Sequence, residues 1–232
     1  MHRASRKVCR VSVFLIYVAL AAGCAGTAPA PSGAEAGDVG SAAPKHGTQN
    51  KRLKPARIEP DGEYGFMLSE VVRVESDVRR DYQRAVTLLQ AGDLEAGIEV
   101  LEGVVERAPE VTNPHIDLGM AYGILGRLED ALAAMRAALA LSPSHPAALN
   151  EMGILQRRAG RFMAARESYE QALAVHPGYH YALLNLGVLC DLYLEDLACA
   201  MDSYSRYESI VSDDQNVAIW IADVERRLAA VE

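Results

Sequence analysis

Two segments of this 232-residue chain end in nearly the same way. Residues 137–145 read ALALSPSHP and residues 172–180 read ALAVHPGYH, so that Pro143 and Pro177 stand 34 residues apart. The Ala-Leu-Ala runs favour helix, and a proline two or three residues later stops it because the ring removes the N–H group. A helix ending that recurs at a fixed interval predicts a repeated structural unit.

The repeat extends over the whole 34-residue period. When residues 112–145 are aligned with residues 146–179, the Leu118-Gly119 pair falls on Met152-Gly153, and Gly126 falls on Gly160. Shifting by one period in either direction gives further copies at 78–111 and 180–214, the last with an insertion near the LYLED sequence. Four consecutive units are therefore predicted.

Glycine and alanine positions indicate that each unit is a pair of antiparallel helices. Gly119, Gly153 and Gly187 are expected to face the small residues Ala131, Ala165 and Ala200, so that two helices can approach closely. Three further glycines fall where the first helix must end and reverse, a position that calls for a left-handed backbone: Gly92, Gly126 and Gly160. A hairpin of this kind leaves an apolar face uncovered, so neighbouring units must stack.

These features resemble the tetratricopeptide repeat (TPR), with its Leu-Gly pair, loop glycine, small residues and closing proline. The resemblance implies an all-α solenoid with about three regular repeats, one divergent repeat and a C-terminal capping helix in residues 215–232. It also implies a concave groove, lined by the first helix of each repeat, that binds a helix or extended peptide of a protein partner. By the register of the repeats the groove residues are Tyr82, Val86, Leu89, Asn113, Ile116, Met120, Ile124, Asn150, Ile154, Arg157, Arg158, Tyr181, Leu184, Val188 and Asp191.

The segment after the last repeat has the pattern of an amphipathic helix. Apolar residues recur at helical spacing, with charged residues on the opposite side. The apolar members are Val217, Trp220, Ile221, Val224 and Leu228. We expect Trp220 to be buried as part of the cap.

The N-terminus has the pattern of a targeting segment. Four basic residues are followed by an apolar run from Val11 to Ala22, which is too short to span a bilayer core that needs about 20 residues. Residues 1–23 resemble a bacterial lipoprotein signal peptide, because the LAAGC ending is similar to the lipobox. The resemblance implies lipidation of Cys24, with palmitate among the acyl groups, and outer-membrane sorting because Ala25 rather than aspartate follows. The alternative is an ordinary signal peptide.

Residues 24–62 predict a flexible linker. They are rich in Gly, Pro, Ala and Ser and contain almost no large apolar residue, so they cannot offset the entropy lost on ordering. The lead-in segment at 63–77 fits strand alternation as well as a helical face, and Ser76 is a candidate cap for a helix that begins at Asp77. We expect the lead-in to pack on the first repeat.

Composition and motifs exclude several function classes. The net charge is −8, and it becomes −12 once the four basic residues of the signal peptide are removed, which disfavours nucleic acid as a partner. The sequence contains no phosphate loop, zinc-protease motif or nucleophile elbow, so we expect neither enzymatic activity nor a cofactor. His176 and His180 are the one close histidine pair, but Pro177-Gly178 interrupts the helix that would align them.

The remaining cysteines, Cys190 and Cys199, lie near the end of the first helix and the start of the second helix of the last repeat. An oxidising periplasm would permit a disulfide between them, and two buried thiols are the alternative.

Together these features predict a lipid-anchored, periplasm-facing scaffold that binds a protein partner or assists assembly of an envelope complex. Related lipoproteins act in pilus secretin assembly, in gliding and beside TonB- or Tol-type systems. The alternatives are an envelope metal-binding protein or enzyme that uses His176 and His180, and a structural lipoprotein that binds peptidoglycan.

Overall fold

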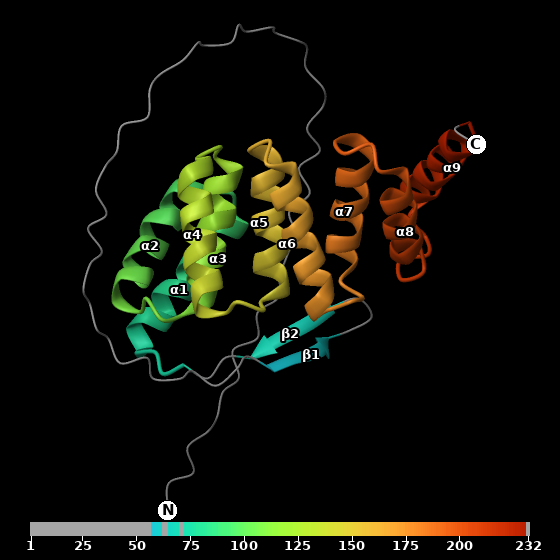
Figure 1. Ribbon diagram of the computed structural model, residues 1–232. Coiled ribbons are helices and arrows are strands. Elements are labelled where there is room, and N and C mark those ends of the chain that lie inside the picture. Colours follow the sequence, from blue (N-terminus) through green and yellow to red (C-terminus); the bar gives the residue numbers. More distant parts are fainter. Residues whose placement is uncertain (1–56, 62–64, 70–71, 231–232) are drawn as a thin grey trace, which may run out of the picture.

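The computed structural model describes residues 57–61, 65–69 and 72–230. This part of the chain is a stack of helices preceded by a short β-hairpin (Figure 1). The helices are α1 (Ser76–Gln90), α2 (Leu94–Arg107), α3 (Thr112–Ile124), α4 (Leu128–Leu141), α5 (Pro146–Arg158), α6 (Phe162–Val175), α7 (His180–Leu192), α8 (Leu197–Glu208) and α9 (Gln215–Ala229). None of the helices in these ranges is both long and apolar enough to cross a membrane.

The helices pack as consecutive antiparallel hairpins. α1 packs with α2, α3 with α4, α5 with α6 and α7 with α8, and each hairpin also contacts the next. The first helices contact each other across repeats as well, from α1 to α3, α3 to α5 and α5 to α7. The predicted all-α solenoid, with four hairpins and a final helix, is confirmed. The signal peptide at 1–23 and Cys24 lie outside the described residues.

A left-handed residue reverses the chain within each hairpin. Gly92, Gly126 and Gly160 have φ values of 84°, 78° and 72°, as the sequence predicts. In the fourth hairpin this conformation falls on Glu195, with φ 54°, inside the predicted insertion. The turns between first and second helices lie along the upper edge of the solenoid in Figure 1.

The close contact inside each hairpin differs from the one predicted. A Cβ atom on Gly119, Gly153 or Gly187 would lie 2.6, 2.5 or 2.4 Å from a side-chain carbon of Met135, Tyr169 or Tyr204 respectively. Each glycine therefore makes room for a large side chain of the second helix, four residues beyond the alanine that we expected to face it. The alanines are also fully buried at the helix crossing: Ala131, Ala165 and Ala200.

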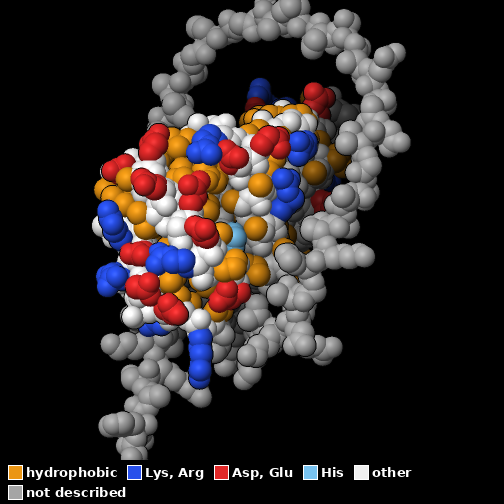
Figure 2. Space-filling view, turned by 90° about the vertical axis from the view of Figure 1, so that its left-hand side faces the viewer, with side chains coloured by type: hydrophobic (Ala, Val, Ile, Leu, Met, Phe, Trp, Pro, Cys, Tyr) orange, Lys and Arg blue, Asp and Glu red, His pale blue; other side chains and the backbone are white. Residues whose placement is uncertain are grey.

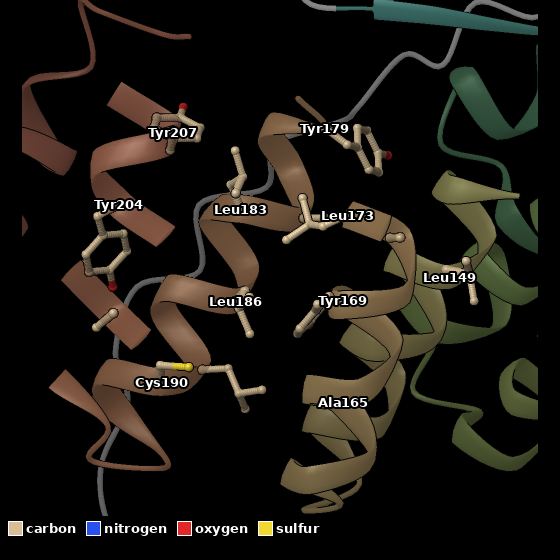
Figure 3. Close-up of a cluster of buried hydrophobic side chains, with 14 of the residues drawn as sticks. Leu149, Ala165, Tyr169, Leu173, Tyr179, Leu183, Leu186, Cys190, Tyr204 and Tyr207 are labelled. Atoms are coloured by element: carbon tan, nitrogen blue, oxygen red, sulfur yellow. The ribbon is translucent and has the colours of Figure 1, made fainter. Parts of the chain in front are cut away.

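The large partners of these glycines are centres of the core. Tyr169 and Tyr204 are at most 1% exposed. Figure 3 shows Tyr169 and Leu173 of α6 pointing towards Leu186 of α7, so that neighbouring hairpins share one apolar cluster. The stacking that the sequence predicts is thus achieved through side chains two turns or less from each glycine contact.

The last helix closes the stack, but not in the way that we predicted for its tryptophan. Val217 and Val224 of α9 are buried, whereas Trp220 is 38% exposed, so the expectation of a buried tryptophan is wrong. Trp220 lies at the edge of the α8–α9 contact, and its ring is tilted against that of Tyr204 with centroids 5.7 Å apart. The valines fill the space between the two helices and leave none for the larger indole.

The segment before the solenoid is partly a β-hairpin. Strands β1 (Arg57–Asp61) and β2 (Gly65–Ser69) pair antiparallel, with Ile58 opposite Leu68. The prediction of an unstructured linker up to residue 62 is therefore wrong for β1, which supplies the backbone partner that β2 needs. Val74 packs against Val78 and Val104 of the first hairpin, as expected for the end of the lead-in segment. Helix α1 begins at Ser76 with Glu75 at its N-cap, so the prediction that Ser76 caps the helix is wrong.

The glycine contacts predict opposite effects of the same substitution at two sites. Gly153→Ala places a methyl group against the fully buried ring of Tyr169 and should destabilise the protein by about 1–3 kcal/mol through overpacking. Gly103→Ala in α2 meets no neighbouring atom and should stabilise by about 0.5–1 kcal/mol through helix propensity. Urea denaturation measures both. Equal stability of the two variants would contradict the packing account.

Candidate functional site

The first helices α1, α3, α5 and α7 present equivalent residues 34 positions apart. We call one such set the floor: Tyr82, Ile116, Asn150 and Leu184. Their neighbours in sequence include Asp117, Glu151 and Asn185, also 34 residues apart. Equivalent residues of stacked repeats lie side by side, so the repeat itself positions this surface.

Each adjacent pair of first helices is tied by a hydrogen bond of one side chain. Tyr82 Oη of α1 donates to Asp117 Oδ2 of α3 at 2.7 Å, and Arg158 Nη1 of α5 donates to the Gly123 carbonyl of α3 at 2.5 Å. Asn185 Nδ2 of α7 donates to Asn150 Oδ1 of α5 at 3.0 Å. These bonds join residues 35 positions apart. Much of the polar capacity of the floor is therefore used within the chain.

The predicted groove residues fall into three groups by exposure. Ile116, Asn150 and Asp191 are buried. Ile124 and Arg158, at the C-terminal ends of α3 and α5, are exposed. The remaining residues are partly buried: Tyr82, Val86, Leu89, Asn113, Met120, Ile154, Arg157, Tyr181, Leu184 and Val188. The structure thus brings these residues onto one row of helices, while their role in partner binding stays a prediction.

Asp191 has a structural partner instead of an open position in the groove. Its side chain is 9% exposed, and Oδ1 lies 2.5 Å from Nη1 of Arg227 in α9. Tyr204 Oη donates to the other carboxylate oxygen at 3.4 Å. The expectation that Asp191 lines an accessible groove is therefore wrong, because the capping helix uses this carboxylate.

This ion pair predicts different effects of two neighbouring substitutions in α9. Arg227→Met should destabilise the protein by about 1–3 kcal/mol, because it leaves the buried Asp191 carboxylate without its charged partner. Arg226 is 78% exposed and pairs with Asp223 on the surface, so Arg226→Met should cost less than about 1 kcal/mol. Thermal and urea melts compare the two. A larger loss for Arg226→Met would show that Asp191 does not hold α9.

Two carboxyl groups beside the floor were missed at the sequence level. Burial raises the pKa of Glu151 to about 7, opposed by the hydrogen bond from Asn150, and raises the pKa of Asp117 to about 6, opposed by the bond from Tyr82. The available signal was their 34-residue spacing next to Ile116 and Asn150. This part of the first-helix surface accordingly gains negative charge as the pH rises through 6 and 7.

The raised pKa of Glu151 predicts a pH-dependent cost. Because the folded protein holds the proton more tightly than the unfolded chain, stability falls as the pH rises from about 4.5 to about 7, and the full cost remains above pH 7. Glu151→Gln should therefore raise the melting temperature more at pH 8 than at pH 5. The extra gain should be at least about 2 °C, since 1 kcal/mol corresponds to roughly 2–4 °C at this chain length.

The matched control for this measurement is Glu167→Gln on the exposed side of α6. It should change the melting temperature little at either pH. If the gain from Glu151→Gln is the same at pH 5 and pH 8, the Glu151 carboxyl is not desolvated in the folded protein.

The two cysteines of the last repeat are joined. The Sγ atoms of Cys190 and Cys199 are 2.06 Å apart, and the bond spans the inserted turn between α7 and α8. Within the described ranges, the one group of three potential metal ligands is Cys190, Cys199 and Asp196, and its two sulfurs are consumed by this bond. His176 and His180 pack among tyrosine rings, with His180 and Tyr181 centroids 3.9 Å apart.

Comparison with known proteins agrees with the geometry. Two family models described as tetratricopeptide repeat match residues 111–178 and 150–214. No curated protein matches. The matched segments coincide with hairpins α3–α4, α5–α6 and α7–α8, and the chain therefore carries a tetratricopeptide-repeat domain.

Solved structures share this fold at low sequence identity. PilF of Pseudomonas aeruginosa is 21% identical, with a TM-score of 0.60 over 66% of this chain and 69% of that one. MamA of Desulfovibrio magneticus RS-1 is 17% identical, with a TM-score of 0.61 over 68% of this chain and 88% of that one. TTC0263, a TPR protein of Thermus thermophilus, is 23% identical, with a TM-score of 0.56 over 64% and 81% of the two chains.

Proposed function

We infer that this protein is a lipid-anchored TPR scaffold of the bacterial cell envelope that binds a segment of a protein partner on its row of first helices. The observation that carries this function is the stack of helical hairpins, which aligns α1, α3, α5 and α7 into one extended surface. Arrays of this kind offer a long face to a peptide or helix.

The charge distribution supports a protein partner over a nucleic acid. Figure 2 shows acidic and basic side chains interspersed on the face at the α1–α2 end. Their fields offset one another there, whereas a nucleic-acid surface collects basic residues. The net charge of −8 is consistent with this.

Two features support a location outside the cytoplasm. The basic, apolar and Gly23-Cys24 order of the N-terminus is that of a lipoprotein signal. The disulfide between Cys190 and Cys199 is of a kind that persists in oxidising compartments and is rare in the cytosol. Attachment through Cys24 would leave the repeat domain facing the periplasm, where it would support assembly of an envelope complex.

The anchor can be tested with two cysteine substitutions in the leader. Cys24→Ser should abolish incorporation of labelled palmitate and move the protein from the membrane fraction to the soluble fraction, because it removes the acylated thiol. Cys9→Ser, in the same leader, should leave both unchanged because Cys9 is removed with the signal peptide. Membrane retention and labelling of the Cys24→Ser protein would refute the lipid anchor and leave the repeat domain unaffected.

A further inference from the structure

Exposed apolar side chains gather at the C-terminal ends of the first helices. Ile124 ends α3 and is 61% exposed, and Leu192 ends α7 and is 66% exposed. The equivalent residue of α5, 34 positions from each, is the exposed Arg158. Tyr193, next to Leu192, is 42% exposed. We call Ile124, Arg158, Leu192 and Tyr193 the rim.

Contacts between hairpins join the rim into one surface. Arg158 bonds to the carbonyl of Gly123, the residue before Ile124, which links the ends of α5 and α3. The guanidinium of Arg157 lies 5.7 Å from the centre of the Tyr193 ring, which links the ends of α5 and α7. Phe162 of α6 packs on the other side of this junction, with its ring centroid 4.9 Å from that of Tyr193. The disulfide beside Tyr193 pins the turn that carries it.

The cation at the centre of the rim is available to a ligand. The other arginines at these turns have carboxylate partners: Arg127 with Asp130, Arg161 with Glu129 and Arg166 with Asp196. Arg158, in the part of the chain that the structure describes, bonds instead to a neutral backbone carbonyl. Its charge is not neutralised there, and a guanidinium retains further N–H donors for a carboxylate.

The floor is a weaker candidate for a ligand. Ile116 and Asn150 are buried, and the bonds from Tyr82 to Asp117 and from Asn185 to Asn150 satisfy its polar groups. An apolar side chain that is about two-thirds exposed loses more water contact on binding than one that is already covered. The rim therefore offers more binding energy than the floor.

We propose that the rim binds an extended protein segment in which two apolar side chains flank a carboxylate. Ile124 and Leu192 would receive the apolar side chains, and Arg158 would pair with the carboxylate. This inference rests on the proposed binding of a protein partner and specifies where and what it binds.

The repeat sets the spacing of the ligand. Neighbouring packed helices lie about 8–10 Å apart, so two steps along the row separate Ile124 from Leu192 by about 20 Å. An extended chain advances about 3.3 Å per residue, which places the two apolar anchors about six residues apart. The carboxylate then falls midway, about three residues from each anchor.

The test uses fluorescent synthetic peptides and the purified full-length protein in detergent, with binding measured by anisotropy. The first peptide has two leucines six residues apart and a central glutamate, the second has a central lysine, and the third has leucines three residues apart around a glutamate. The first should bind about tenfold or more tightly than the other two. Failure of all three to saturate, or equal affinity for all three, would overturn the proposal.

Substitutions then locate the site. Arg158→Glu should reverse the preference, so that the lysine peptide binds more tightly than the glutamate peptide. Ile124→Asp and Leu192→Asp should each weaken the first peptide about tenfold or more, while Ile219→Asp, which changes a residue of α9 that is also 66% exposed, should not. Thermal melts confirm that each variant is folded, as expected for exposed positions.

The outcomes separate this proposal from the scaffold function. Peptide binding that ignores every rim substitution would overturn the rim as the site and leave protein binding in place. Loss of binding on Ile154→Asp alone, in a protein that remains folded, would move the site to the inner part of the first-helix row. Failure of the Cys24→Ser test would remove the anchor and leave the rim unaffected.

Discussion

The solenoid depends on one recurrent contact, in which a glycine of the first helix receives a large side chain of the second. Tyr169 and Tyr204 fit against Gly153 and Gly187 so closely that a single added methyl group would lie about 2.5 Å from a ring carbon. The contact sets how near the two helices of a hairpin approach, and it directs the rest of the second helix onto the next hairpin. The shared cluster in Figure 3 is built from the same tyrosines.

A second constraint acts between hairpins, along the first helices. The bonds from Tyr82, Asn185 and Arg158, together with the Arg227–Asp191 ion pair, tie each first helix to the next. These bonds close the floor and leave the chain ends of α3, α5 and α7 as the accessible part. The same repetition that stabilises the stack therefore arranges Ile124, Arg158 and Leu192 in a line.

The period of 34 residues was sufficient to predict the hairpins, their number and the left-handed turns at Gly92, Gly126 and Gly160. It did not predict the partner of each glycine, because Ala131 and Met135 lie one helical turn apart on the same face and only packing selects between them. Asp191 was assigned to the groove by register, but a charge from α9, 36 residues later, reaches it. Trp220 and strand β1 failed for the same reason, since both depend on neighbours outside their own segment. Membrane attachment through Cys24 stays a prediction from the leader sequence.

Site-specific photo-crosslinking in living cells tests the central claim most directly, because it reports which face meets a partner in the envelope. A photoreactive residue would replace Ile124, Leu192 or, as the control, Arg136 on the exposed side of the second helix α4. The account predicts the same crosslinked partner at positions 124 and 192, loss of that product on Arg158→Glu, and no product at position 136. Crosslinks at position 136 that survive Arg158→Glu, with none at the two rim positions, would contradict it.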